Sequence, residues 1–172
     1  MRKIILYIAT SLDSYIARND HSLDWLFTDQ DYGYTPFLGT IDTTLMGYTT
    51  FEQVLGFGEF PYQDKKNFVF TRNHADTNYP YAVFISGNIE QIVTELKNAE
   101  GKDIWLIGGG EINTILLNAN LIDSIIISIH PVILGAGIPL FTGIIRESHF
   151  ELVDTVSFSS GLVQLTYKKI GV

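Results

Sequence analysis

Three consecutive glycines, Gly108, Gly109 and Gly110, are the residues whose type and spacing say most about chemistry. The apolar run before them, 104–107, is typical of a buried strand, and a helical pattern follows them. Residues without a Cβ let the backbone turn sharply and leave amide N–H groups bare. At a helix N-terminus such groups suit a phosphate or a flat heterocycle, so the sequence predicts a nucleotide site here.

This glycine triplet differs from two common nucleotide motifs. It lacks the G-x-G-x-x-G spacing of the dinucleotide-binding fingerprint, and it lies late in the chain rather than after the first strand. It also lacks the Lys and Ser/Thr of a P-loop. A standard dinucleotide fold and an NTPase are therefore disfavoured, and the alternative to a nucleotide site is a plain strand-to-helix turn.

Two further segments could hold an anion, because each follows a predicted strand. Residues 47–50 read Gly-Tyr-Thr-Thr and enter a short helix that Thr49 or Thr50 could cap. Residues 71–73 read Thr-Arg-Asn, and Arg72 could pair bidentately with a phosphate or lie solvated on the surface. In open α/β sheets ligands bind at the carboxyl ends of the strands, so the three segments together predict one cleft.

The elements that would position these segments alternate along the chain. Apolar runs predict strands over residues 3–9, 42–47, 67–71, 81–85, 103–107, 121–129, 150–158 and 162–169. Helices are expected over 32–38, over 51–54, from Asn88 to Gly101, and after Gly110; Asn88 and Gln91 have capping-box spacing. The pattern predicts an α/β fold with a mainly parallel sheet and an antiparallel C-terminal hairpin.

Composition limits the class of protein. We expect one domain over residues 1–172, and a hydrophobic fraction of 46% is ample for its core. A net charge of −8 argues against nucleic-acid binding. No cysteine is present, which excludes thiolate metal sites, and we predict no bound metal. The first apolar run is too short for a membrane span or a signal core, so we expect a cytoplasmic protein without membrane contact.

The order of the motifs resembles the dihydrofolate reductase superfamily, and especially the reductase domain of the bifunctional riboflavin-biosynthesis protein and its stand-alone relatives. The resemblance covers nearly the whole chain. It rests on Ser11-Leu12-Asp13-Ser14-Tyr15-Ile16-Ala17, Met46-Gly47-Tyr48-Thr49-Thr50-Phe51-Glu52, Phe70-Thr71-Arg72, Ile107-Gly108-Gly109-Gly110 and Pro131-Val132-Ile133-Leu134-Gly135.

The resemblance implies NADPH as the hydride donor. Ala9, Ile16 and Ala17 would line the nicotinamide, whereas Gly47, Thr49 and Thr50 would hold the pyrophosphate. Thr71 and Arg72 would meet the adenosine end and its 2′-phosphate. The segment along the nicotinamide ribose and the phosphates would comprise Ile107, Gly108, Gly109, Gly110, Glu111 and Ile112, with a cis peptide between Gly108 and Gly109.

The chain departs from its relatives at two positions. Tyr48 stands where they usually carry Arg, which removes a cation near the 2′-phosphate, and Tyr48 could instead stack on adenine. Ser14 stands where they typically carry Gly. On the substrate side the resemblance implies a buried acid. Counting back from Met46-Gly47 points to Asp31, whereas counting from Trp25 points nearer to Asp29; both could also be surface residues. Asp13 could serve only to fix its loop.

The resemblance therefore implies an NADPH-dependent reductase of a small heterocycle, either pterin-like or a ribosylaminopyrimidine. One alternative is a nucleotide-binding or ligand-sensing protein of the same fold without turnover. Another is a flavodoxin-like FMN protein, although Thr10-Ser11-Leu12-Asp13 matches its phosphate loop poorly. The riboflavin-type relatives are commonly homodimers, and the apolar 125–140 region with the C-terminal hairpin could supply such an interface. Trp25 and His130 are expected to be structural.

Overall fold

The computed structural model describes residues 1–72 and 78–171. Its strands are β1 Ile4–Thr10, β2 Tyr15–Ala17, β3 Ile41–Gly47, β4 Lys66–Phe70, β5 Ala82–Ile85, β6 Asp103–Gly108, β7 Ser124–Ile129, β8 Ile138–Pro139, β9 Phe150–Ser157 and β10 Val163–Lys169. Its helices are α1 Tyr34–Thr40, α2 Tyr48–Gly56, α3 Ile89–Asn98 and α4 Gly110–Asn118.

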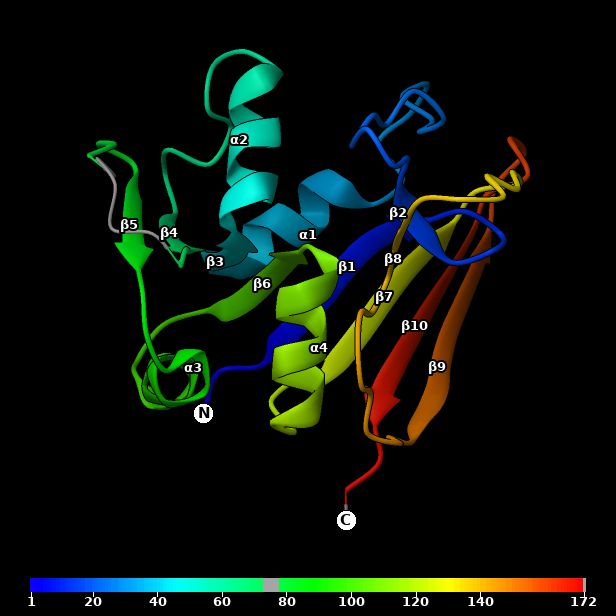
Figure 1. Cartoon of the computed structure of the whole chain (residues 1–172). Helices are drawn as coiled ribbons and strands as arrows, with labels where there is room; N and C mark the ends of the chain where they lie inside the picture. Colours follow the sequence, from blue (N-terminus) through cyan, green and yellow to red (C-terminus); the bar gives the residue numbers. More distant parts are fainter. Residues whose placement is uncertain (73–77, 172) are drawn as a thin grey trace.

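An eight-stranded sheet in the order β5-β4-β3-β6-β1-β7-β10-β9 forms the centre of the molecule (Figure 1). The pairs from β5 to β7 are parallel, whereas β10 pairs antiparallel with both β7 and β9. The predicted α/β architecture with an antiparallel C-terminal hairpin is confirmed. Because the six consecutive strands run parallel, their carboxyl ends meet at one edge of the sheet.

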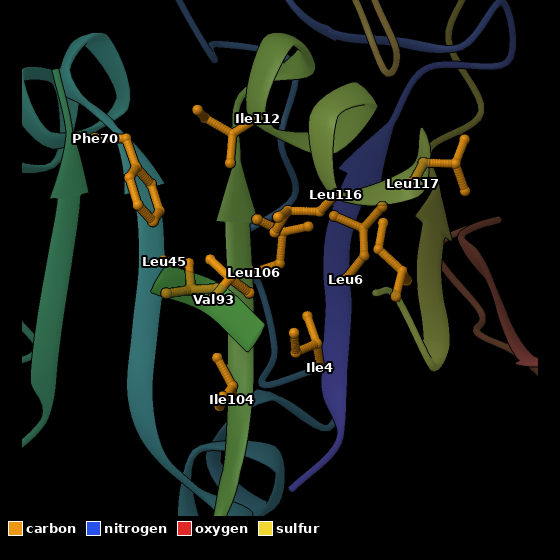
Figure 2. Close-up of a cluster of buried hydrophobic side chains, with 11 residues drawn as sticks. Ile4, Leu6, Leu45, Phe70, Val93, Ile104, Leu106, Ile112, Leu116 and Leu117 are labelled. Atoms are coloured by element: carbon orange, nitrogen blue, oxygen red, sulfur yellow. The ribbon is translucent and has the colours of Figure 1, made fainter. Parts of the chain in front are cut away.

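The centre of the sheet is covered on both faces, as the alternation of side chains along β1 shows. Ile4 and Leu6 point into a core closed by α3 and α4 (Figure 2), whereas Ile5 and Tyr7 point into a second core with side chains of α1 and α2. A parallel strand covered on both faces is apolar throughout, which explains why residues 4–9 look like an unbroken hydrophobic run. In the described part of the chain, no helix is long and apolar enough to cross a membrane.

Most predicted elements are observed, with shifts at their ends. Asn88 caps α3 as predicted, because its side chain accepts a hydrogen bond from the Gln91 N–H at 3.2 Å. The helix ends at Asn98, three residues before Gly101. The small antiparallel pair of β2 and β8 was not predicted, because these short segments lie more than a hundred residues apart in the sequence.

Candidate cofactor and substrate cleft

A cavity of about 910 Å³ lies at the carboxyl edge of the parallel strands, within the range of ligand sites in proteins. Residues that follow β3, β4, β5 and β6 line it, together with the end of β1. Asn73 lies outside the described residues. The structure brings together fourteen of the fifteen predicted cofactor residues in this lining: Ala9, Ile16, Ala17, Gly47, Tyr48, Thr49, Thr50, Thr71, Arg72, Ile107, Gly109, Gly110, Glu111 and Ile112.

Two helices begin at this cavity, and neither has a side-chain cap at its N-terminus. The N-cap of α2 is Gly47 and that of α4 is Gly109. The prediction that Thr49 or Thr50 caps α2 was wrong, because the helix begins at Tyr48 and both threonines lie in its first turn. The first N–H groups of each helix therefore have no side-chain acceptor, and they carry the positive end of the helix dipole.

The glycine triplet forms the turn that the sequence suggested. The Gly108–Gly109 peptide bond is cis, as predicted. Gly108 is the predicted cofactor residue that does not line the cavity; its α-carbon instead faces the side chain of Asn113. Gly109 and Gly110 line the cavity themselves. The bare backbone that the sequence predicted is therefore supplied by the second and third glycines.

A strap of chain, residues 137–142, packs against both β2 and the start of α4. A Cβ on Gly110 would lie 2.5 Å from the carbonyl oxygen of Pro139. A Cβ on Gly137 would overlap the carbonyl oxygen of Ala17. Both positions accept only glycine, because backbone atoms already occupy the space. The strap thus joins two walls of the cavity that are far apart in sequence.

Arg72 and Glu111 form an ion pair at the cavity, one following β4 and the other in the first turn of α4. Their side chains are 80% and 59% exposed, so the pair lies open to solvent. An exposed pair is weak, typically below about 1 kcal/mol, and an anionic ligand can compete for the guanidinium. Arg72 is thus placed to hold a phosphate, with Glu111 as its competitor.

The loop between β1 and β2 positions the part of the cavity wall that Ile16 and Ala17 of β2 form. Ser14 in this loop has φ of 65°, a left-handed conformation that favours glycine. The carboxylate of Asp13 accepts hydrogen bonds from the N–H groups of Leu134 (3.1 Å) and Gly135 (2.8 Å) and from the Ser11 hydroxyl (2.6 Å). Asp13 fixes the loop, as expected, although two of its partners are remote in sequence. These bonds, the Ser11 hydroxyl foremost, hold the pKa of Asp13 below its ordinary value.

Neither candidate substrate acid lines the cavity. Both oxygens of Asp31 are within 3.2 Å of the Thr35 N–H, and one also accepts from the Thr35 hydroxyl at 2.6 Å. The Asp29 carboxylate accepts from the Tyr32 hydroxyl at 2.7 Å. The geometry gives no support to Asp31 as the substrate acid. Among the described residues, Glu111 is the one carboxylate that lines the cavity.

Sequence reasoning missed an aromatic pocket within the cavity, formed by Tyr7, Tyr34, Tyr62 and Trp105. Two of these residues carried a usable signal. Tyr7 precedes Ala9 by two residues on β1, and Trp105 precedes Ile107 by two on β6, so each pair shares one face of its strand. Tyr34 and Tyr62 come from α1 and from the loop after α2, and only the tertiary fold brings them to this face.

Trp105 lies at the centre of the aromatic pocket. Its ring centroid is 5.2 Å from Tyr62, 5.8 Å from Tyr34 and 6.3 Å from Tyr7, all with edge-to-face geometry. Burial raises the pKa of the Tyr7, Tyr34 and Tyr62 hydroxyls, so all three stay protonated at neutral pH. The walls of the pocket are therefore aromatic rings with neutral phenol hydroxyls.

Trp25 and His130 are structural, as expected. His130 is 3% exposed and packs against Trp25 and Phe27, with centroid distances of 5.1 Å and 5.0 Å. Neither Trp25 nor His130 lines the cavity. Burial lowers the pKa of His130, so the imidazole is neutral in the folded protein near pH 7.

The sheet is mainly parallel and ends in an antiparallel hairpin, and its carboxyl edge holds a cavity at which two helices begin. This arrangement is the dihydrofolate reductase-like fold. Residues 2–164 match the family model of the RibD C-terminal domain, and the chain belongs to this family. The chain is 39% identical to Uncharacterized protein YyaP of Bacillus subtilis (strain 168), over 96% of this chain and 94% of that protein.

Solved structures agree with this assignment. The structure of the "Putative riboflavin biosynthesis protein" from Shewanella sp. PV-4 superposes with a TM-score of 0.85 at 30% identity, covering 99% of this chain and all of that one. Dihydrofolate reductase from Enterococcus faecalis, complexed with NADP(H) and RAB-propyl, gives 0.73 at 20% identity, covering 97% and 96%. The diaminohydroxyphosphoribosylaminopyrimidine deaminase/5-amino-6-(5-phosphoribosylamino)uracil reductase from Thermotoga maritima gives 0.75 at 16% identity, covering 98% of this chain and 57% of that one. The last two likenesses concern the fold alone.

Proposed function

We propose that this protein is an NADPH-dependent reductase that transfers hydride to a pterin-like or ribosylaminopyrimidine substrate, as in riboflavin biosynthesis. The observation that carries the proposal is the pair of uncapped helix N-termini, those of α2 and α4, that line one cavity. Two sets of free N–H groups fit a diphosphate. Family membership and the NADP(H) complex of a structural neighbour support the same proposal.

Residues of this chain would hold NADPH as follows. Gly47, Thr49 and Thr50 would bind the pyrophosphate with N–H groups and hydroxyls. Thr71 and Arg72 would bind the 2′-phosphate end. The residues that would lie along the nicotinamide and its ribose are Ala9, Ile16, Ala17 and 107–112. Gly108 would contribute only to the turn, because it does not line the cavity and faces Asn113.

A bound reduced nicotinamide would supply the hydride, that is, both electrons of the reduction. The chain's own contribution is positioning and exclusion of water. Ala9 and Ile107 place apolar side chains at the strand ends, and the aromatic pocket continues deeper along the same two strands. A flat substrate held against these walls would be oriented for transfer at little entropic cost.

A second candidate function is ligand sensing without turnover in the same cleft. It is favoured by one observation: in the described part of the chain, no Asp or Glu lines the aromatic pocket. Asp31, whose charge acts on Tyr7 and Tyr34, is bonded to Thr35, and the lining carboxylate Glu111 is paired with Arg72. A reductase that protonates its substrate would then have to take the proton from a phenol or from water.

Binding and turnover measured together separate these functions. NADPH affinity is measured by fluorescence, and NADPH oxidation is followed with a ribosylaminopyrimidine and with a dihydropteridine. Oxidation with either compound supports the reductase. Tight NADPH binding without oxidation across both classes supports sensing, and absence of NADPH binding overturns both.

A matched pair of variants tests the placement of the cofactor. Thr50→Val removes a hydroxyl that lines the cavity, and we expect it to weaken NADPH binding by about 10-fold. Thr94→Val is the control, because the Thr94 hydroxyl is exposed on α3 and bonds to the Glu90 carbonyl at 2.7 Å. Equal NADPH affinity in both variants would contradict the assigned role of Thr50.

A further inference from the structure

Side chains of α4 form hydrogen bonds with backbone atoms of the strap. The side-chain amide of Asn113 donates to the carbonyl oxygen of Leu140 at 2.9 Å. The hydroxyl of Thr114 accepts a hydrogen bond from the N–H of Thr142 at 2.8 Å. Hydrogen bonds are directional, so these two fix which residue of the strap lies beside which residue of the helix.

The hydroxyl of Thr114 makes a second bond at the same time, because it also donates to the carbonyl oxygen of Gly110 at 2.9 Å. Gly110 and Thr142 both line the cavity. Thr114 itself is only 7% exposed and does not line the cavity. One buried hydroxyl therefore joins the first residue of α4 to the strap, outside the space that a ligand would occupy.

The strap and the first residue of α4 are also in direct contact. A Cβ on Gly110 would lie 2.9 Å from the Cγ2 of Thr142, as well as overlapping the Pro139 carbonyl oxygen. Atoms packed this closely transmit a displacement rather than absorb it. A change in the spacing between Thr142 and Gly110 would therefore shift the first turn of α4, whose N–H groups form one of the two uncapped helix N-termini at the cavity.

Attachment of the strap does not depend on the Thr114 hydroxyl. Leu140 and Phe141 of the strap pack against the buried core that α4 closes. Burying one large apolar side chain contributes roughly 1.5–3 kcal/mol, whereas one hydrogen bond contributes about 1 kcal/mol net. Loss of the hydroxyl should therefore leave the strap attached to the core while its spacing from α4 becomes less well defined.

We propose that Thr114 is a positioning residue for the nucleotide: its hydroxyl holds the strap and the first turn of α4 at the spacing in which the N–H groups of α4 bind a diphosphate. This inference rests on the proposed function, and it assigns part of the nucleotide affinity to a residue that does not touch the nucleotide. A threonine bonded to the carbonyl four residues earlier is ordinary in helices. The bond from the strap is what distinguishes Thr114.

Matched substitutions at Thr114 test this role. Thr114→Val keeps the shape of the side chain and removes both bonds, and we expect it to weaken NADPH binding by about 10-fold in calorimetry. Thr114→Ser keeps the hydroxyl and should stay within about 2-fold of the parent. Thr94→Val is the control, because Thr94 also bonds to the carbonyl four residues earlier but lies exposed on α3. Parent affinity in Thr114→Val overturns the inference, and so does an equal loss in Thr114→Ser.

A second ligand separates positioning from a general loss of structure. Adenosine 2′-monophosphate carries the 2′-phosphate but no diphosphate, and its affinity is measured by competition with NADPH. It should bind equally to Thr114→Val and to the parent. An equal loss for both ligands would show that Thr114 only stabilises the fold, which overturns the inference. A parent protein that binds no NADPH overturns the proposed function itself, and the inference with it.

A measurement on the parent protein applies even if Thr114→Val does not fold. Coupling between two equilibria is reciprocal, so nucleotide binding must strengthen the Thr114–Thr142 bond by the factor by which the bond strengthens nucleotide binding. Exchange of the Thr142 N–H with deuterium should therefore slow by about 10-fold when NADPH saturates the protein. The N–H of Arg146, bonded to Asn118 at 2.8 Å beyond the strap, is the internal control. Exchange at Thr142 that does not slow overturns the inference.

Discussion

Arg72 and Glu111 are an ion pair that joins the end of β4 to the first turn of α4 across the mouth of the cleft. The guanidinium that would meet a 2′-phosphate is thus already paired with a carboxylate. Tyr48, where an arginine would add a second cation, lines the same cavity. If the proposed function holds, the choice between NADPH and NADH would depend on whether the 2′-phosphate can displace Glu111 from Arg72.

Removing the competing charge should strengthen binding of the phosphorylated cofactor. Glu111→Gln is expected to tighten NADPH binding by roughly 2- to 5-fold, the scale of an exposed ion pair, and to leave NADH affinity unchanged. Calorimetric titration at low salt measures both. An equal change for the two cofactors would show that Glu111 does not compete for Arg72.

Ser14 is held at a backbone conformation that costs a non-glycine residue free energy. With φ at 65°, Ser14→Gly is expected to stabilise the protein by about 1 kcal/mol, which is roughly 2 to 4 °C in Tm for a chain of this size. Ser159→Gly is the control, since Ser159 is exposed in a turn and has no positive φ. Differential scanning calorimetry would contradict the interpretation if both variants shifted Tm equally.

His130 should make stability depend on pH. Because its folded pKa lies below the unfolded value, the unfolded chain binds more protons between the two values, and stability rises with pH there. The contribution is complete above about pH 6.5 and declines as the pH falls toward the folded pKa. When the pH is lowered from about 7.5 to 5, the urea midpoint of unfolding should fall less in His130→Gln than in the parent protein. His149→Gln, on the exposed surface, serves as the control, and an unchanged loss in His130→Gln would refute the assignment.

The homodimer remains a prediction, and β9 gives it a location. In the described part of the chain β9 pairs only with β10, and it exposes Leu152 by 53%, Val153 by 52% and Val156 by 38%. An apolar edge strand suits pairing with the same strand of a second copy about a two-fold axis. Leu152→Glu should convert the dimer into a monomer in light scattering, whereas Glu151→Gln should not. A monomeric parent protein would refute the prediction.

Local pattern was sufficient for the sheet and for the three segments after strands that line the cavity, because buried parallel strands and glycine turns leave their mark in consecutive residues. The other lining residues, such as Ala9 and Ile16, were predicted from the family resemblance. Local pattern failed where distant segments meet. Tyr34 and Tyr62 join Trp105 only through the packing of α1 and the loop after α2. Asp31 occupied a plausible position in sequence, but the N–H and hydroxyl of Thr35 bind its carboxylate at the start of α1.

The strap at residues 137–142 has a consequence for how this cleft could diversify. Gly110 touches the strap at the Pro139 carbonyl, and Gly137, within the strap, touches the Ala17 carbonyl, so neither position can vary without separating the walls. Tyr34 and Tyr62 have no such backbone constraint, because side chains alone define that end of the cavity. Residues 34 and 62 could therefore be exchanged to accept new molecules while the helix N-termini and the strap stay the same, which makes this chain a suitable starting scaffold for altered specificity.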